Sequence, residues 1–306
     1  KRREFGMIER STALVVGAGA GVAYGFPTGR RLRRDILDRI ESLSSAGIVS
    51  LEEARAFGAA FRQSGCISID EFLQSRTDLN ELGKFAIATA LMPKEVHGNL
   101  FNVDLDAEEH WYEYLFQKMS SDFEDFGLNQ LGIVTFNYDR SLEQYLHTAL
   151  CNKFDRSPVE AAKQLEKLNI VHMHGQLGYL DWQREADVAS TRDYKADAAK
   201  QAALVRASKD IAVIHEEIPE ARLKAALSVV HSAETVFFLE FGYGQTNMER
   251  LRVREFRSPE QLIGTAYGLT LRERGAISRS VDEKIRTDMM YDCGMVSLFR
   301  NHRGLD

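Results

Sequence analysis

The sequence predicts an α/β fold, a Rossmann-like doubly wound parallel sheet with helical insertions. Short apolar runs rich in β-branched residues recur along the 306 residues, and several of them show no alternation of polar and apolar positions. Strands of this kind are covered on both faces, as in a parallel sheet. Segments with helical spacing of apolar residues separate the runs, and that alternation is typical of right-handed βαβ units.

The strand and helix signals follow one another in a regular order. We expect strands at residues 13–16, 132–136, 169–173, 235–241 and 261–265, with 295–299 as a weaker sixth strand. A helical stripe follows the first strand and consists of Leu32, Ile36, Ile40 and Leu43. A second stripe follows the second strand and consists of Leu142, Tyr145, Leu146 and Leu150.

Two long segments carry helical patterns without a strand, and we predict them to be helical insertions. The first runs from about 49 to 125, with helices expected at 51–64, 68–75, 82–91 and 108–123. The second runs from about 195 to 232 and is rich in Ala, Lys and Glu. The polar stretch 181–197 is expected to be an irregular loop. Because the chain shows no internal repeat and has only 5 prolines, residues 1–306 are predicted to form a single domain.

Composition excludes several classes of function. The 39 basic and 45 acidic residues give a net charge of −6, which argues against a general nucleic-acid binder and leaves at most an indirect nucleic-acid contact. No apolar run approaches the ~18 residues of a membrane helix, so we expect no membrane contact. Cys66, Cys151 and Cys293 lie far apart without a CxxC pair, so we expect neither a disulfide framework nor a four-cysteine zinc site. A cytoplasmic location is therefore expected.

The most informative segment joins the first strand to the first helix. It reads Gly17-Ala18-Gly19-Ala20-Gly21-Val22-Ala23-Tyr24-Gly25-Phe26-Pro27-Thr28-Gly29, with five glycines in thirteen residues. Without Cβ atoms, such a segment can bring backbone N–H groups against a phosphate near a helix N-terminus. It is not the dehydrogenase fingerprint, because Val22 stands where GxGxxG needs glycine. It is not a P-loop either, because no Gly-Lys-Ser/Thr follows. A tight turn without a ligand is the alternative, and pyrophosphate binding is favoured.

Polar residues follow the second and third predicted strands. Asn137 lies just after a strand, where α/β folds place their ligands, and Asp139 is either a helix N-cap or a site residue. The third strand leads into His172-Met173-His174-Gly175. A metal pair of the two histidines lacks a third ligand in the sequence, so we expect no metal. We expect His174 instead to reach the crevice of Asn137 and to act on a hydroxyl group or water.

The fourth strand also ends in a glycine-bounded polar loop. This loop carries amide side chains and reads Gly242-Tyr243-Gly244-Gln245-Thr246-Asn247. The carboxyl ends of parallel strands meet at one edge of a sheet. The sequence therefore predicts that the glycine segment, an Asn, a His and this polar turn share one crevice.

Taken in order, these segments resemble the NAD-site motifs of the sirtuin superfamily. The resemblance rests on Gly17-Ala18-Gly19 with Gly25-Phe26-Pro27, on Thr135-Phe136-Asn137-Tyr138-Asp139, and on His174-Gly175. Two further segments look like signatures of the bacterial anti-phage branch of that superfamily, namely Ser68-Ile69-Asp70-Glu71-Phe72-Leu73 and Gly264-Thr265-Ala266-Tyr267-Gly268. The resemblance spans residues from about 13 to 270.

The resemblance implies an NAD+ hydrolase (NADase) that depletes NAD during anti-phage defence. Such proteins cleave NAD+ to nicotinamide and ADP-ribose or its cyclic form, and NAD is their substrate. They often assemble into rings, so a homo-oligomer is implied, and some members pair with a HerA-type ATPase or helicase. Activation through assembly or a partner is expected, because a permanently active NADase would poison its host.

The resemblance also assigns roles to individual residues. Asn137 holds the nicotinamide ribose and orders water, His174 polarises a ribose hydroxyl, and Asp139 orients the site. Residues from the glycine-rich segments are expected to bind the nucleotide: Gly17, Ala18, Gly19, Gly21, Phe26, Pro27, Thr28, Gly242, Tyr243 and Asn247.

The chain also departs from the deacylases of the superfamily. It lacks the four cysteines of their zinc module, Gly21 stands where many relatives have Ser, and Thr28-Gly29 replaces an Asp-Phe-Arg run. Two alternatives to the hydrolase stay open. One is a zinc-independent NAD-dependent deacylase or ADP-ribosyltransferase that uses the same pocket. The other is a non-catalytic NAD- or ADP-ribose-binding scaffold subunit.

Overall fold

A computed structural model describes residues 6–119, 122–183, 191–195, 200–256 and 261–305. Its centre is a parallel six-stranded sheet with the order β3-β2-β1-β4-β5-β6. The strands are β1 (Thr12–Val16), β2 (Leu131–Thr135), β3 (Asn169–His172), β4 (Thr235–Leu239), β5 (Gln261–Thr265) and β6 (Met290–Tyr291). The doubly wound α/β fold is confirmed, and the strand order reverses between β1 and β4, which is where such folds bind ligands.

The five stronger strand predictions are confirmed, with ends that differ by at most two residues, but the sixth is wrong. Residues 295–299 lie inside helix α14 (Met295–Asn301), and the sixth strand is the two-residue β6 just before it. The buried side chains of α14 are Met295, Val296, Leu298 and Phe299. Their spacing is that of a helix face, which a run of only five residues does not distinguish from a buried strand.

The helices of the described residues connect and cover the strands. They are α1 (Gly29–Arg39), α2 (Ser42–Ser45), α3 (Leu51–Gln63), α4 (Ile69–Ser75), α5 (Asn80–Leu91), α6 (His97–Leu100), α7 (Trp111–Lys118), α8 (Ser141–Phe154), α9 (Pro158–Leu165), α10 (Gln201–Ser208), α11 (Glu220–Ser232), α12 (Gln245–Arg250), α13 (Leu271–Ser280) and α14. Among the described residues, no helix is both long and apolar enough to cross a lipid bilayer.

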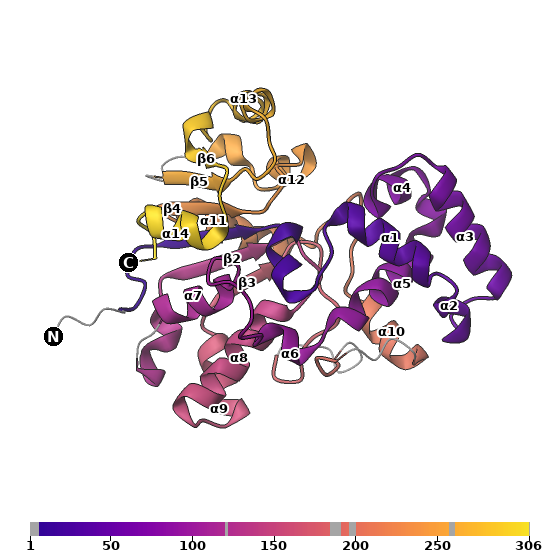
Figure 1. Ribbon diagram of the computed structural model, residues 1–306, viewed down its shortest axis with the longest axis horizontal. Coiled ribbons are helices and arrows are strands. Elements are labelled where there is room, and N and C mark those ends of the chain that lie inside the picture. Colours follow the sequence, from indigo (N-terminus) through magenta and orange to yellow (C-terminus); the bar gives the residue numbers. More distant parts are fainter. Residues whose placement is uncertain (1–5, 120–121, 184–190, 196–199, 257–260, 306) are drawn as a thin grey trace.

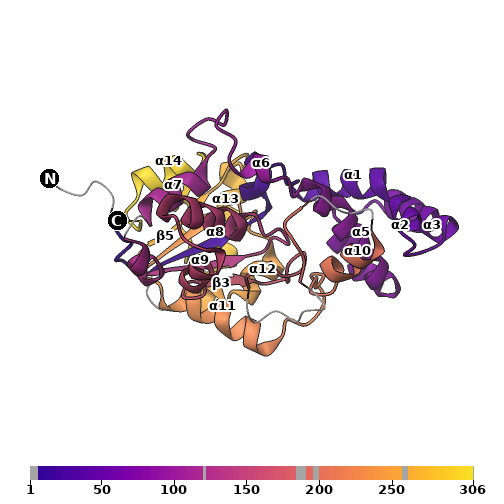
Figure 2. The ribbon, with the colours of Figure 1, turned by 90° about the horizontal axis from the view of Figure 1, so that it is seen from below.

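Both faces of the sheet are buried. Leu14 of β1 and Ile133 of β2 face one apolar cluster, whereas their neighbours Val15 and Val134 face another. Figure 2 shows α11 on one side of the sheet and α7 with α14 on the other. Burial on both faces explains why these strands lack polar alternation in the sequence.

The helices α1 to α5 pack together with α10 beside the sheet, and we call this group the helical lobe (Figure 1). Residues 195–232, which we expected to form the second insertion, do not form one unit. Helix α10 packs on α5 in the helical lobe, whereas α11 packs on β1, β2 and β3 as the crossover into β4. Of the loop expected at 181–197, residues 184–190 and 196–197 lie outside the described residues.

Candidate functional site

The glycine segment leaves β1 at the edge of the sheet where the strand order reverses. Gly17 follows the strand, and residues Ala18–Tyr24 form a 3₁₀ helix. The Gly17 N–H donates to the Leu239 carbonyl oxygen at 2.9 Å. A Cβ atom at position 17 would lie 2.3 Å from the carbonyl oxygen of Glu240. Only glycine therefore allows the end of β1 to lie this close to the end of β4, and that requirement holds whether or not a nucleotide binds.

Asn137 links the glycine segment to the end of β2. Its Nδ2 donates to the carbonyl oxygen of Gly17 at 3.0 Å, and its backbone N–H donates to Thr135 Oγ1 at 3.1 Å. The Oδ1 atom is buried and has no hydrogen-bond partner within the described part of the chain. A buried amide oxygen without a partner is a ready acceptor for a hydroxyl group or a water molecule.

A small cavity lies next to Asn137. Its volume is about 20 Å³, and its polar lining includes Thr135, Asn137, Asp139, Glu143 and His172. That volume accommodates roughly one water molecule, and the lining offers it several hydrogen-bond partners. The Asn137 side chain is therefore held in place on one side by the glycine segment and borders a polar, water-sized space.

Asp139 lies two residues before the first residue of α8 and also borders the glycine segment. Its Oδ1 accepts hydrogen bonds from the Ser141 backbone N–H, at 3.2 Å, and from the Ser141 hydroxyl. Burial raises the pKa of Asp139, while the hydrogen bonds from Ser141 act in the opposite direction. A Cβ atom at Gly21 would lie 3.7 Å from Asp139 Oδ2. Asp139 therefore accepts from the first residue of α8, whose N-cap is Arg140, and lies beside the predicted nucleotide-binding segment.

His174 reaches the same edge from β3. The sheet register pairs Thr135 with His172, so Asn137 and His174 follow their strands at equivalent positions. The His174 ring is buried, with its Nε2 3.4 Å from Asn247 Oδ1 and both ring nitrogens 3.3 Å from Arg250 Nη1. Burial first, and then the Arg250 cation, lower the pKa of His174 to about 4. At neutral pH the ring is uncharged and has a nitrogen that accepts a proton.

His172 has different partners from His174. Its Nδ1 lies 2.9 Å from the Asn137 carbonyl oxygen, and its Nε2 lies 2.5 Å from Glu143 Oε1. Burial acts to lower the pKa of His172, but the Glu143 carboxylate, the Asn137 carbonyl oxygen and Asp139 together outweigh it, so the pKa is raised. The two histidines do not converge on a common point, and the described residues contain no cluster of three or more His, Cys, Asp or Glu that could hold a metal. His172 therefore positions the backbone of Asn137.

The remaining residues that we predicted to bind the nucleotide fall into two groups. Ala18, Gly19, Thr28 and Gly242 line a cleft of about 290 Å³ at the ends of β4 and β5. The side chain of Phe26 is buried, at 4% exposure, and it packs beside Gly21 ahead of Pro27. The residues at the cleft can contact a nucleotide through their backbone atoms and their small side chains.

The side chain of Tyr243 does not point into this cleft, contrary to what we expected from the sequence. It is buried, and its hydroxyl group donates to the Thr265 carbonyl oxygen at 2.8 Å. The ring occupies the space above Gly264, where a Cβ atom would lie 1.9 Å from the Tyr243 oxygen. Tyr243 therefore joins β4 to β5, and the amide side chain of this loop that faces the site is that of Asn247, beside His174.

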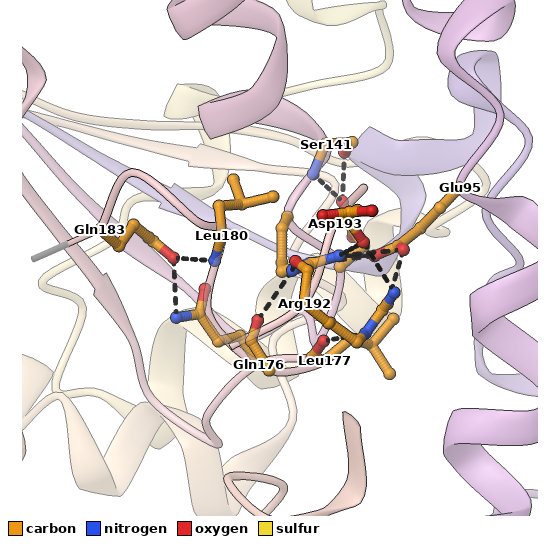
Figure 3. A network of polar contacts seen from close by, with 11 residues as sticks. Glu95, Ser141, Gln176, Leu177, Leu180, Gln183, Arg192 and Asp193 are labelled. Carbon is orange, nitrogen blue, oxygen red and sulfur yellow. Dashed lines mark hydrogen bonds and ion pairs between the residues drawn. The ribbon is translucent and has the colours of Figure 1, made fainter. Parts of the chain in front are cut away.

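A buried ionic network holds the segment after Asn137, and sequence reasoning missed it. Glu95, between the helical lobe and α6, accepts from Arg140 Nε and Nη2 at 3.0 Å each and from Arg192 Nη2 at 2.5 Å (Figure 3). All three side chains are buried, and Arg140 also donates to the carbonyl oxygens of Gly178 and Arg192. The network ties the loop that carries Asn137 to the chain around 178–193.

Arg250 is the second functional candidate that sequence reasoning missed. It lies one helical turn after Asn247, and that spacing is the signal that would have placed it on the same face of α12. Glu95 had no comparable signal, because it contacts Arg140 and Arg192 only after the chain has folded.

Comparison with known proteins supports one family relationship. Residues 131–257, fewer than half of the chain, match the family model described as SIR2-like domain. Neither the curated proteins nor the solved structures gave a significant match. The matched range carries Asn137, Asp139, His174 and Asn247, and the glycine segment precedes it. SIR2-like domains are in general NAD-dependent enzymes, so the match supports a sirtuin-like relationship and an NAD-related activity for this chain.

Proposed function

We propose that the chain is an NAD+ glycohydrolase that releases nicotinamide and ADP-ribose. The observation that supports this most is the position of Asn137, which is hydrogen-bonded to the glycine segment after β1 and follows β2 at the position equivalent to that of His174 after β3. Asn137 Nδ2 is bonded to Gly17 while its Oδ1 is left as an acceptor, and the uncharged ring of His174 follows the adjacent strand. A dinucleotide whose pyrophosphate lies along the glycine segment brings its nicotinamide ribose to Asn137 and His174.

This arrangement suits cleavage of an N-glycosidic bond. The C–N bond to nicotinamide breaks, nicotinamide leaves as a neutral molecule, and the ribose becomes an oxocarbenium-like cation. A water molecule adds to that carbon and gives up one proton, for which the His174 ring is an acceptor. Asn137 Oδ1 orients the water or the ribose hydroxyls. The reaction then depends mainly on positioning and on stabilising the cation, and it needs no covalent nucleophile.

The alternative reactions need a channel that leads an acceptor to the ribose. A cavity of about 650 Å³ lies on the outer side of β3, and its lining includes His172, Gln176 and Arg222. Among the described residues that line it, neither Asn137 nor His174 is present. The chain lacks the four-cysteine zinc module of the deacylases, and this favours water over an acylated peptide as the acceptor. A pure scaffold subunit has no need of both Asn137 and His174.

The cellular role that we propose is depletion of NAD in the cytoplasm during anti-phage defence. A permanently active enzyme would deplete the NAD of its own cell. We therefore propose that the chain is restrained until it assembles as a homo-oligomer or with a HerA-type ATPase. The support for this part is the resemblance of the sequence motifs to the anti-phage branch of the sirtuin superfamily.

Nicotinamide release from NAD+ tests the reaction. We expect release by the wild type without an acylated peptide, at a rate per subunit that rises with protein concentration or on adding a HerA-type ATPase. The measurement is product formation by chromatography at several protein concentrations. Release only when an acylated peptide is present would overturn the hydrolase in favour of the deacylase. NAD+ binding without release under every condition would favour the scaffold.

The pH profile of the reaction tests the state of His174. Because its pKa is about 4, the uncharged ring persists as the pH falls through 6.5, and the rate should decline only as the pH approaches 4. Arg250→Gln removes the cation, makes protonation of His174 easier, and should move this acid limb upward by roughly one pH unit. The measurement is kcat/KM against pH for both proteins. An acid limb near pH 6.5 in the wild type, or the same acid limb in both proteins, contradicts the role of an uncharged His174 held by burial and Arg250.

A further inference from the structure

The chain between α10 and α11 joins the helical lobe to the site. Helix α10 lies in the lobe and α11 lies on the sheet, and residues 210–216, which we call the connecting segment, lie between them (Figure 2). The Ala212 N–H donates to the His174 carbonyl oxygen at 2.8 Å, and a Cβ atom at Gly175 would lie 1.7 Å from the Asp210 carbonyl oxygen. The backbone around His174 therefore packs directly on the connecting segment.

Arg250 joins the same segment to the side chain of His174. Its Nη1 lies 3.3 Å from both ring nitrogens of His174. Its Nη2 donates to the carbonyl oxygens of Ile214 and, at 3.2 Å, of Glu216. One guanidinium group thus contacts both the ring and the connecting segment, so the orientation of the ring is tied to the position of the segment.

The helical lobe holds the connecting segment through polar side chains of α4 and α5. From α4, Asp70 Oδ1 accepts a hydrogen bond from the Ile214 N–H at 3.3 Å. From α5, Lys84 Nζ lies 2.9 Å from Glu216 Oε1. Both contacts reach residues whose carbonyl oxygens accept from Arg250, so the lobe, the segment and Arg250 form one continuous set of polar contacts.

Asp70 belongs to the segment Ser68–Leu73, which the sequence analysis singles out and to which the proposed reaction gives no role. Local structure accounts for the other residues of this segment. Ser68 caps α4, and Glu71 accepts from the Ile67 N–H at the start of the same helix. The buried apolar residues of the segment are Ile69, Phe72 and Leu73. Asp70 is the residue of the segment whose side chain contacts the connecting segment instead of its own helix.

The Asp70 carboxylate also interacts with Arg250. Burial raises the pKa of Asp70, and the Ile214 N–H, His215 and Arg250 act in the opposite direction. Burial lowers the pKa of Arg250, while Tyr138 and Asp70 act to raise it. The carboxylate and the guanidinium therefore favour each other's charged form, in addition to their shared contact with Ile214.

We infer that Asp70 is a positioning residue for the cleavage of NAD+: from the helical lobe it fixes the connecting segment and Arg250, and Arg250 in turn orients the His174 ring. Asp70 acts through Arg250 and not on the substrate. The inference rests on the proposed function, in which His174 is the proton acceptor. It gives the helical lobe a part in the reaction, because a change in the position of α4 is transmitted to His174.

The kcat of an Asp70→Asn protein tests the inference. The amide keeps an oxygen that can accept from the Ile214 N–H, but it lacks the charge that faces Arg250. We expect nicotinamide release at saturating NAD+ to slow by roughly tenfold and KM to change by less than about threefold, because a misplaced His174 ring affects the reaction more than binding. Asp70→Glu restores the charge and should recover most of the lost rate.

A double variant and a matched control separate positioning from general damage. In an Arg250→Gln protein, adding Asp70→Asn should lower kcat by less than about twofold more, because the residue through which Asp70 acts is already gone. Glu71→Gln is the control, since it changes an exposed carboxylate of the same helix, and it should keep the wild-type kcat. Losses from Asp70→Asn and Arg250→Gln that simply multiply in the double variant would overturn the inference.

The NMR signal of the His174 ring gives a test that does not need the reaction. It is recorded without nucleotide on protein with ¹³C-labelled histidine and is assigned by its absence from His174→Ala. We expect this signal to shift in Asp70→Asn and in Arg250→Gln and to stay in place in Glu71→Gln. An unchanged signal in a folded Asp70→Asn protein would overturn the inference.

This signal also distinguishes the inference from the proposed function. No nicotinamide release by the wild type, with the expected shifts observed, would overturn the hydrolase and leave the positioning of His174 by Asp70 standing. If Asp70→Asn does not fold, Arg250→Gln decides: a shifted His174 signal supports the route through Arg250, and an unchanged one overturns it.

Discussion

Replacement of Asn137 or His174 by alanine is expected to lower the rate of nicotinamide release by a factor of about 10²–10⁴. Asn137→Ala removes the bond to the Gly17 carbonyl oxygen and the buried acceptor oxygen Oδ1. His174→Ala removes the uncharged ring that accepts the proton. Each change affects a group that acts only when the ribose and water are in place. The loss should therefore fall mainly on kcat, with NAD+ binding retained.

Two matched variants separate this effect from general damage to the protein. Asn152→Ala removes an amide at an exposed position of α8, where it bonds the Thr148 carbonyl oxygen, and His97→Gln removes an exposed imidazole. Both controls should keep the wild-type rate. Asn137→Asp retains an oxygen at the acceptor position but replaces the donor to Gly17, and we expect it to be as impaired as Asn137→Ala. Losses below about tenfold in both alanine variants, with the circular dichroism spectrum unchanged, would remove Asn137 and His174 from the mechanism.

Glu95→Gln is expected to lower the free energy of unfolding by about 3–5 kcal/mol. The Glu95 carboxylate is the acidic partner that both Arg140 and Arg192 share, and all three side chains are buried. Burial lowers the pKa of Arg192 to about 10, which still leaves the guanidinium charged at neutral pH. Without Glu95, two buried cations face each other without compensation.

Urea denaturation of the purified variants measures this loss. Arg192→Met is the informative companion, because it removes one cation and leaves the pair of Glu95 with Arg140 intact, so its loss should be smaller. Glu41→Gln breaks the exposed ion pair with Arg55 and should leave the midpoint unchanged. A Glu95→Gln protein as stable as Glu41→Gln would show that the network does not hold the loop after Asn137. If Glu95→Gln does not fold, the comparison of Arg192→Met with Glu41→Gln still tests the network, because only Arg192→Met should lower the free energy of unfolding.

Some elements of this fold were predictable because their signals are local. The strands β1, β2 and β4 are short apolar runs, and burial on both faces requires such runs whatever the neighbouring strands are. The run at 295–299 was misassigned because five apolar residues satisfy a strand and a helix equally well, and only packing decided between them. The placement of α11 was not predictable for the same reason. Its sequence indicates a helix, but only its packing on β1, β2 and β3 shows that it is a crossover of the sheet and not part of an insertion.

The sequence by itself determined the α/β class and the positions of Asn137, Asp139 and His174 at strand ends, because strand ends follow from chain order alone. Only the tertiary structure decided that Asn137 bonds Gly17, that Arg250 helps to keep His174 uncharged, and that Tyr243 points into the sheet. The Glu95 network was likewise decided by folding. These contacts join residues far apart in the chain. Their energies depend on distance, burial and neighbouring charge, which a linear pattern does not specify.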